Sequence, residues 1–110
     1  MDSYELIITP NAIADLTELR NYIAEALLAP RTALAYVETI EKEIKTLSTM
    51  PARYKLIDEE PEHSAGVRRL IANNFFVYYW IDESEKKVYI TNVIYTRRDQ
   101  LKALSDKNKD

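Results

Sequence analysis

The sequence predicts a single α+β domain in which an antiparallel helical hairpin packs on a twisted antiparallel sheet. Three observations indicate this fold class: a short β-prone segment near the N-terminus, two apolar stripes of helical period, and two hairpins that form a C-terminal three-stranded meander. A single Gly and four Pro leave no linker or low-complexity segment. We therefore expect one domain over residues 1–110, with a frayed tail over residues 103–110.

The first strand is predicted over residues 4–9, which are β-prone and are followed by Pro10. Thr9 or Asn11 can then cap a helix. Apolar residues at spacings of three and four predict that this helix runs to about Leu28. Its stripe consists of Ala12, Leu16, Leu19, Ile23 and Leu27.

A second helix is predicted to begin at Pro30, because the missing N–H of proline would be unsatisfied in a first turn anyway. Its apolar stripe consists of Ala33, Val37, Ile40, Ile44 and Leu47. The helix should end before Met50 and Pro51, since a residue that precedes Pro is pushed out of helical geometry. Residues 53–57 then form a short strand or an extended arm, and the acidic residues 58–66 form a loop.

The most specific local signal is the pair Asn73-Asn74 between two β-rich runs, 67–72 and 75–81. Asparagine tolerates the positive φ of a two-residue hairpin turn. This turn places Ile71 opposite Phe76 and Arg69 opposite Tyr78. A second turn over residues 82–87 leads into a strand over 88–95, with Ile81 opposite Val88.

Strand alternation separates the meander into two faces. The apolar face, predicted to lie under the helices, carries Leu70, Phe75, Val77, Tyr79, Ile81, Val88, Ile90 and Ile94. The other face carries Arg69, Ile71, Phe76, Tyr78, Trp80, Tyr89, Thr91, Val93, Tyr95 and Arg97. Asn92 falls on the apolar face, where it needs a hydrogen-bond partner. The aromatic face exceeds what a solitary monomer usually exposes, which implies a partner unless a C-terminal helix folds back over it.

Composition argues against several classes of protein. With no Cys and a single His, we expect no metal and no cofactor. No apolar run reaches the roughly 18 residues of a membrane span and no leader precedes the first strand, so we expect a cytoplasmic protein without membrane contact. The net charge of -3 offers no global attraction to nucleic acid, although basic residues outnumber acidic ones from Val67 onward.

The order of strand, helical hairpin and three-stranded meander resembles the RelE/ParE superfamily of type II toxin-antitoxin toxins, whose fold is microbial RNase-like. The likeness covers Tyr4 to about Leu101. It rests on residues 14–16 (ADL), 21–23 (NYI), 47–51 (LSTMP), 67–71 (VRRLI), 77–82 (VYYWID) and 88–97, with YTRRD at 95–99. The resemblance implies a toxin that arrests growth until a cognate antitoxin neutralises it, and a role in plasmid stabilisation.

Two mechanisms are implied by the resemblance. RelE-like toxins are mRNA interferases that cut messenger RNA on the ribosome, and ParE-like toxins inhibit DNA gyrase. For the nuclease, Arg69 and Arg97 would clamp the phosphate, and Tyr95 or Tyr78 would transfer a proton or stack on a base. RelE-like nucleases usually carry a further Arg where this chain has Phe76, and a Tyr or His near the C-terminus, where Ala103 and its neighbours supply neither. We therefore favour gyrase as the target.

The expected partner-binding residues are Phe76, Tyr78, Trp80, Tyr89 and Arg98. Their partners would be the antitoxin and either gyrase or the ribosome with its message, in a homodimer or a toxin-antitoxin hetero-oligomer. An inactive interaction module is the further alternative. Arg68 and His63 are interpreted as solvated or paired surface residues. The acidic run 58–60 is interpreted as a solvating loop, with a general base as its alternative.

Overall fold

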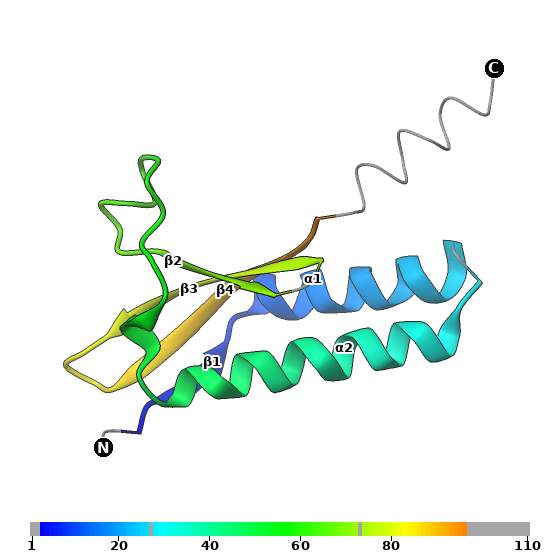
Figure 1. Cartoon of the computed structure of the whole chain (residues 1–110), viewed down its shortest axis with the longest axis horizontal. Coiled ribbons are helices and arrows are strands. Elements are labelled where there is room, and N and C mark those ends of the chain that lie inside the picture. The colour runs from blue at the N-terminus through cyan, green and yellow to red at the C-terminus, as the bar shows by residue number, and fades with distance from the viewer. Residues whose placement is uncertain (1–2, 27, 73, 97–110) are drawn as a thin grey trace.

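The computed structural model describes residues 3–26, 28–72 and 74–96, which form two helices on one side of a four-stranded sheet (Figure 1). The elements in chain order are β1 (Glu5–Ile8), α1 (Pro10–Asn21) with a π-helical turn (Tyr22–Ala26), α2 (Pro30–Lys45), 3-10 turns (Thr46–Ser48 and Pro51–Arg53), β2 (Arg68–Ala72), β3 (Phe75–Asp82) and β4 (Lys87–Tyr95). The predicted α+β class and the order of its elements are confirmed.

The sheet is mixed, with strand order β1-β4-β3-β2, whereas the sequence predicted an antiparallel sheet. The meander β2-β3-β4 is antiparallel, but β1 pairs parallel to β4. Thr9, at the end of β1, holds this junction: its N–H and its hydroxyl both donate to the carbonyl of Ile90, at 3.1 and 2.8 Å. The Thr9 Oγ1 also accepts the N–H of Ala12 and so caps α1, which is one of the two predicted caps.

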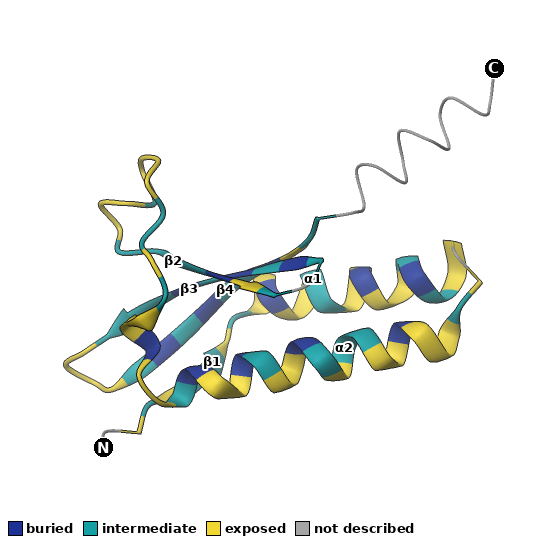
Figure 2. Cartoon of the chain, viewed as in Figure 1, coloured by how far each residue is buried: buried dark blue, intermediate teal, exposed yellow. Residues whose placement is uncertain are grey.

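The core lies between the helices and the sheet, as Figure 2 shows by the buried stripes that the helices turn inward. Both predicted stripes supply it: Ala12, Leu19 and Ile23 from the first helical segment, and Ala33, Ile40, Ile44 and Leu47 from the second. The sheet contributes Leu70, Phe75, Val77, Tyr79, Val88, Ile90 and Val93. Leu27, predicted for the first stripe, falls outside the described residues.

Both hairpins have the predicted register at their turns. Arg69 pairs with Tyr78 and Ile71 with Phe76, and Ile81 pairs with Val88. The register then shifts inside β4: Tyr79 pairs with Ile90 but Tyr78 pairs with Asn92, which leaves Thr91 as an extra residue. This β-bulge inverts the alternation of every residue that follows it.

The predicted faces of β4 are therefore wrong beyond Thr91. Val93 is buried against the helices, whereas Ile94 is 46% exposed on the opposite face. Tyr95 also turns to the helix side, where its ring makes an edge contact with Tyr36 of α2 at 5.7 Å between centroids. The strand pattern contained a sign of this shift, because Asn92 did not suit an apolar face.

Asp15 of α1 stabilises the bulge. Its carboxylate accepts the backbone N–H of Val93 at 2.9 Å and the side-chain amide of Asn92 at 3.2 Å. Asn92 thus has the hydrogen-bond partner that it needs, and the first helix is joined to the distorted part of β4 by a charged acceptor.

Tyr79 and Arg68 attach the segment after α2 to the sheet. The buried Tyr79 hydroxyl donates to the carbonyl of Pro51 at 2.6 Å, and burial raises the pKa of Tyr79, which keeps this donor protonated. Arg68 donates to the carbonyl of Tyr54 at 2.7 Å, in agreement with its interpretation as a paired residue. Residues 54–57 are an extended arm, with an isolated bridge from Leu56 to Arg68.

We predict that Asp15→Ala lowers the free energy of unfolding by about 2 kcal/mol, because it leaves the Val93 N–H without its charged acceptor. Urea unfolding followed by circular dichroism measures this change. Thr17→Ala, on the exposed side of the same helix, is the control and should change stability by less than about 0.5 kcal/mol. Equal effects of the two substitutions would contradict the role of Asp15.

We predict that Tyr79→Phe costs about 1 to 2 kcal/mol, because the substitution keeps the buried ring but removes the donor to Pro51. Tyr89→Phe, on a half-buried tyrosine of the opposite face, is the matched control. Thermal and urea unfolding of both variants provide the comparison, and a neutral Tyr79→Phe would show that the hydrogen bond is dispensable.

Candidate functional site

The candidate site is the face of the meander that turns away from the helices, which we call the outer face. It carries Arg69, Ile71, Phe76, Tyr78, Trp80, Tyr89 and Ile94. Ile71 is 57% exposed, and the aromatic residues are half-buried. Within the described part of the chain no helix covers this face, as Figure 1 shows.

The aromatic side chains of the outer face are held by contacts with one another. Trp80 and Tyr89 stack with their rings 4.4 Å apart and 9° from parallel. Phe76 and Tyr78 meet edge to face at 6.4 Å, and the Arg69 guanidinium lies 4.8 Å from the centre of the Phe76 ring. These contacts fix rigid, amphipathic side chains at the surface, a composition typical of protein-binding sites.

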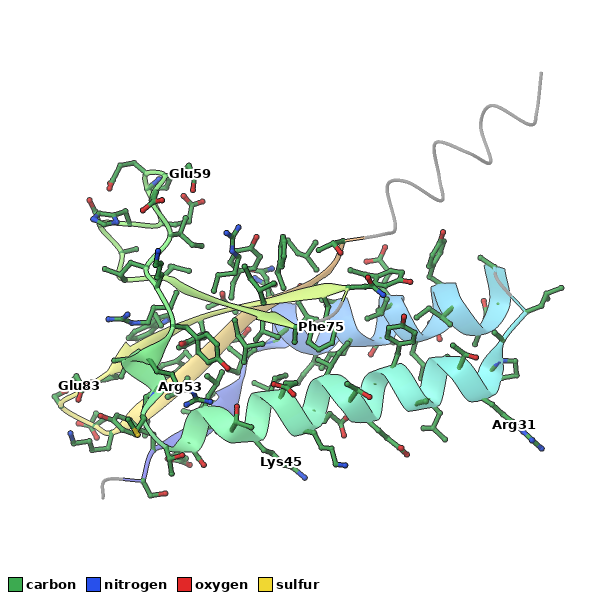
Figure 3. All side chains as sticks on the ribbon, viewed as in Figure 1. Arg31, Lys45, Arg53, Glu59, Phe75 and Glu83 are labelled. Atoms are coloured by element: carbon green, nitrogen blue, oxygen red, sulfur yellow. The ribbon has the colours of Figure 1, made fainter. Side chains whose placement is uncertain are left out.

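The segment between α2 and β2 rises from the sheet on the side opposite the helices, and Figure 3 shows Glu59 near its tip. We call residues 55–67 the loop. Within it, His63 Nδ1 lies 2.9 Å from the carbonyl of Ile57, and the N–H of Ile57 donates to Val67 at 2.9 Å. His63 is exposed and serves the loop's own structure, in line with its interpretation as a surface residue.

A cleft of about 410 Å³ lies between the loop and the outer face. It is lined by Ile57, Glu59, Glu62 and Val67 of the loop and by Arg69, Tyr78, Thr91, Asn92 and Ile94 of the sheet. The bulge helps to build the cleft, because it places Ile94 on the outer face, opposite Phe76, where it lines the cleft together with Tyr78. We call this space the loop cleft.

Two carboxylates and one guanidinium line the loop cleft: Glu59 and Glu62 face a space that also contains Arg69. Arg69 lies beside a second cleft of about 390 Å³ as well, on the other side of the arm, where Arg53, Lys55, Asp58 and Glu59 contribute to the lining. Both spaces therefore carry charges of both signs. Such a surface matches a protein segment with mixed charges better than a uniform polyanion.

The structure brings together some of the predicted site residues and separates others. Arg69, Phe76, Tyr78, Trp80 and Tyr89 share the outer face, as predicted. Tyr95 does not, because it lies on the helix side of the bulge. Arg97 and Arg98 lie outside the described residues, so the predicted clamp of Arg69 with Arg97 stays a prediction.

Sequence reasoning missed several residues that shape the site. Glu62, Thr91 and Asn92 line the loop cleft, and Asp15 supports it from the first helix. The polarity of Asn92 in an apolar strand was the available signal. Asp15 stands 77 positions away from Asn92, and nothing local in the sequence connects them.

The described residues contain no group of three or more His, Cys, Asp or Glu side chains that would suit a metal ion. None of their helices is long and apolar enough to cross a membrane.

Comparison with solved structures supports the fold. The chain resembles a chain of a chromosomal ParDE toxin-antitoxin system from P. aeruginosa, with a TM-score of 0.69 and 24% identity over 84% of this chain and 96% of that one. It also resembles a chain of the toxin-antitoxin complex RelBE2 from Mycobacterium tuberculosis, with a TM-score of 0.62 and 25% identity over 86% and 93%. A mutant of the E. coli toxin RelE in the free state has a TM-score of 0.57 at 12% identity, over 96% and 97%.

Comparison with sequences gives the family. No curated protein sequence matches the chain. Residues 6–100 match the family model described as ParE toxin of type II toxin-antitoxin system, parDE. This match spans the helical hairpin, the loop and the whole meander. The chain therefore belongs to the ParE toxin family of type II toxin-antitoxin systems, within the RelE/ParE superfamily.

Proposed function

We propose that this toxin arrests growth by binding DNA gyrase and that a cognate antitoxin holds it inactive. The observation that carries the proposal is the chemistry of the outer face. Arg69 lies over Phe76, where RelE-like nucleases usually have a second Arg, and the other charged residues of the loop cleft are acidic. Half-buried aromatic side chains flanked by mixed charges suit a protein partner.

Electrostatics favours a protein target over a ribosome-bound message. Of the described side chains that line the loop cleft, one is cationic and two are acidic, so a phosphodiester backbone would meet repulsion there. The net charge of -3 adds no long-range attraction to RNA. Binding to a protein requires no such excess of positive charge.

The antitoxin is the second proposed partner. Two of the similar solved structures are described as a ParDE toxin-antitoxin system and a RelBE2 toxin-antitoxin complex, which supports a partner of this kind. An antitoxin that covered the outer face would bury Ile71, Ile94 and the aromatic residues, which a solitary monomer seldom leaves open.

One observation favours the alternative function, a RelE-like mRNA endonuclease. The loop cleft is lined by Arg69, Tyr78, Glu59 and Glu62. A cation, a proton donor and a general base are the groups that metal-free RNA cleavage needs. An inactive interaction module is the third possibility, and normal growth after induction of soluble protein would support it.

We predict that the purified protein inhibits gyrase supercoiling, while messenger RNA stays intact in induced cells. Supercoiling assays and mapping of message 5' ends measure the two activities. Arg69→Ala is the informative variant: loss of codon-phased cuts with this variant would instead establish the nuclease. Absence of both gyrase inhibition and message cleavage would contradict both mechanisms.

We predict that Trp80→Ala abolishes growth arrest while the protein stays folded, because truncating an aromatic anchor at a protein interface typically costs about 2 kcal/mol or more in binding. Leu34→Ala is the control, since Leu34 is 57% exposed on the helix side. Growth after induction and the melting temperature of each purified variant provide the readouts. Full toxicity of a folded Trp80→Ala protein would remove the outer face from the mechanism.

A further inference from the structure

The loop cleft combines two acidic residues, Glu59 and Glu62, which we call the acidic wall, with aliphatic and aromatic residues. We infer that it binds a basic side chain, Lys or Arg, from an antitoxin segment that lies across the outer face. This inference rests on the proposed function, because it assumes that the antitoxin docks on that face. It adds the chemistry of the contact and the residues of the toxin that recognise it.

The acidic wall consists of Glu59 and Glu62, which come from the same loop and line the same cleft. Within the described part of the chain, neither side chain makes a hydrogen bond or an ion pair. Their charges are therefore not neutralised by the toxin itself. A cation from outside the chain would be attracted by both carboxylates at once, which is more favourable than contact with a single surface charge.

The apolar part of the cleft suits the stem of a long basic side chain. Ile57 and Val67 of the loop and Ile94 of β4 line the same space as the carboxylate residues. Lys and Arg place their methylene groups along such surfaces while the charged end reaches polar partners. Ile94 takes part only because the bulge at Thr91 turns it outward.

Arg69 does not cancel the acidic wall. Its guanidinium lies over the Phe76 ring, and its backbone N–H donates to the carbonyl of Lys55 at 3.3 Å. It borders both clefts beside the arm, so it is placed to bind a carboxylate of the same partner. The expected partner segment thus carries a basic residue for the loop cleft and an acidic residue near Arg69.

This arrangement favours a protein over a nucleic acid as the occupant. A phosphodiester drawn to Arg69 would also face Glu59 and Glu62, whereas a basic side chain is attracted by both carboxylates. The antitoxin is the partner for which such a contact matters most. Partly buried charge pairs mainly slow dissociation, and an inhibitor must stay bound to its toxin.

The test measures binding of the antitoxin encoded with this toxin, by calorimetric or surface-based titration against the full chain. Glu59→Gln and Glu62→Gln remove charge and keep shape. Glu85→Gln, in the exposed turn between β3 and β4, is the matched control. We expect each cleft variant to bind about 10-fold more weakly than the control, mainly through faster dissociation. We also expect their affinities to fall less steeply with salt.

A charge exchange identifies the partner residue. Each Lys and Arg of the antitoxin is changed to Glu, and the weakened mutants are tested against Glu59→Lys and Glu62→Lys toxins. Recovery of binding by one reciprocal pair supports the inference. If no mutant recovers and the two Gln variants bind like the control, the inference is overturned.

Failure of the inference and failure of the proposed function give different results. Normal binding by the Gln variants together with weak binding by Trp80→Ala leaves the antitoxin on the outer face and overturns only the basic subsite. Unchanged binding by all these variants overturns the docking on this face as well. Binding of a short single-stranded RNA to the unmodified toxin that is as tight as antitoxin binding and is lost in Arg69→Ala would also overturn it, because the cleft would then serve a polyanion.

Discussion

The contact between the Asp15 carboxylate and the N–H of Val93 decides how the last strand presents its residues. It stabilises a bulge at Thr91, and everything beyond the bulge depends on that extra residue. With the bulge, Val93 enters the core and Ile94 reaches the loop cleft. Without the bulge, the carboxylate of Asp15 would face the sheet with no hydrogen-bond partner there, and Ile94 would no longer line the loop cleft.

The site depends equally on how the loop is anchored at its base. Tyr79 and Arg68, neighbours across β2 and β3, hold the carbonyls of Pro51 and Tyr54 on the helix side of the sheet. The polypeptide between these anchors and β2 can then rise over the outer face. A buried tyrosine inside the core thus helps to anchor the start of the segment that carries Glu59 and Glu62, through a hydrogen bond to the backbone.

The sequence was most informative where structure is local. Helical stripes, the proline at the start of the second helix and the two predicted turns gave the elements and the register at both hairpins, because each depends on residues close in the chain. Sequence reasoning missed three features: the parallel pairing of β1 with β4, the bulge at Thr91, and the position of Tyr95 on the helix side of the sheet. Each depends on a contact between distant segments, such as Asp15 with Val93, that no periodicity records.

The aromatic outer face was predicted almost completely, since strand alternation is enough to gather residues of β3. The loop cleft was not, because the position of an irregular segment over a sheet follows from tertiary contacts. In the sequence, its acidic residues were interpreted as part of a solvating loop. Only the structure shows that they line the same cleft as Arg69 and Ile94.

The pairing of β1 with β4 has a consequence for biosynthesis. Thr9 binds Ile90, 81 positions later, so β1 cannot pair with its neighbouring strand, β4, until that strand has left the ribosome. Contacts this distant in sequence form late and slowly. Throughout most of its translation the nascent chain therefore lacks the completed sheet, and the outer face takes its final form only after the last strand has been made.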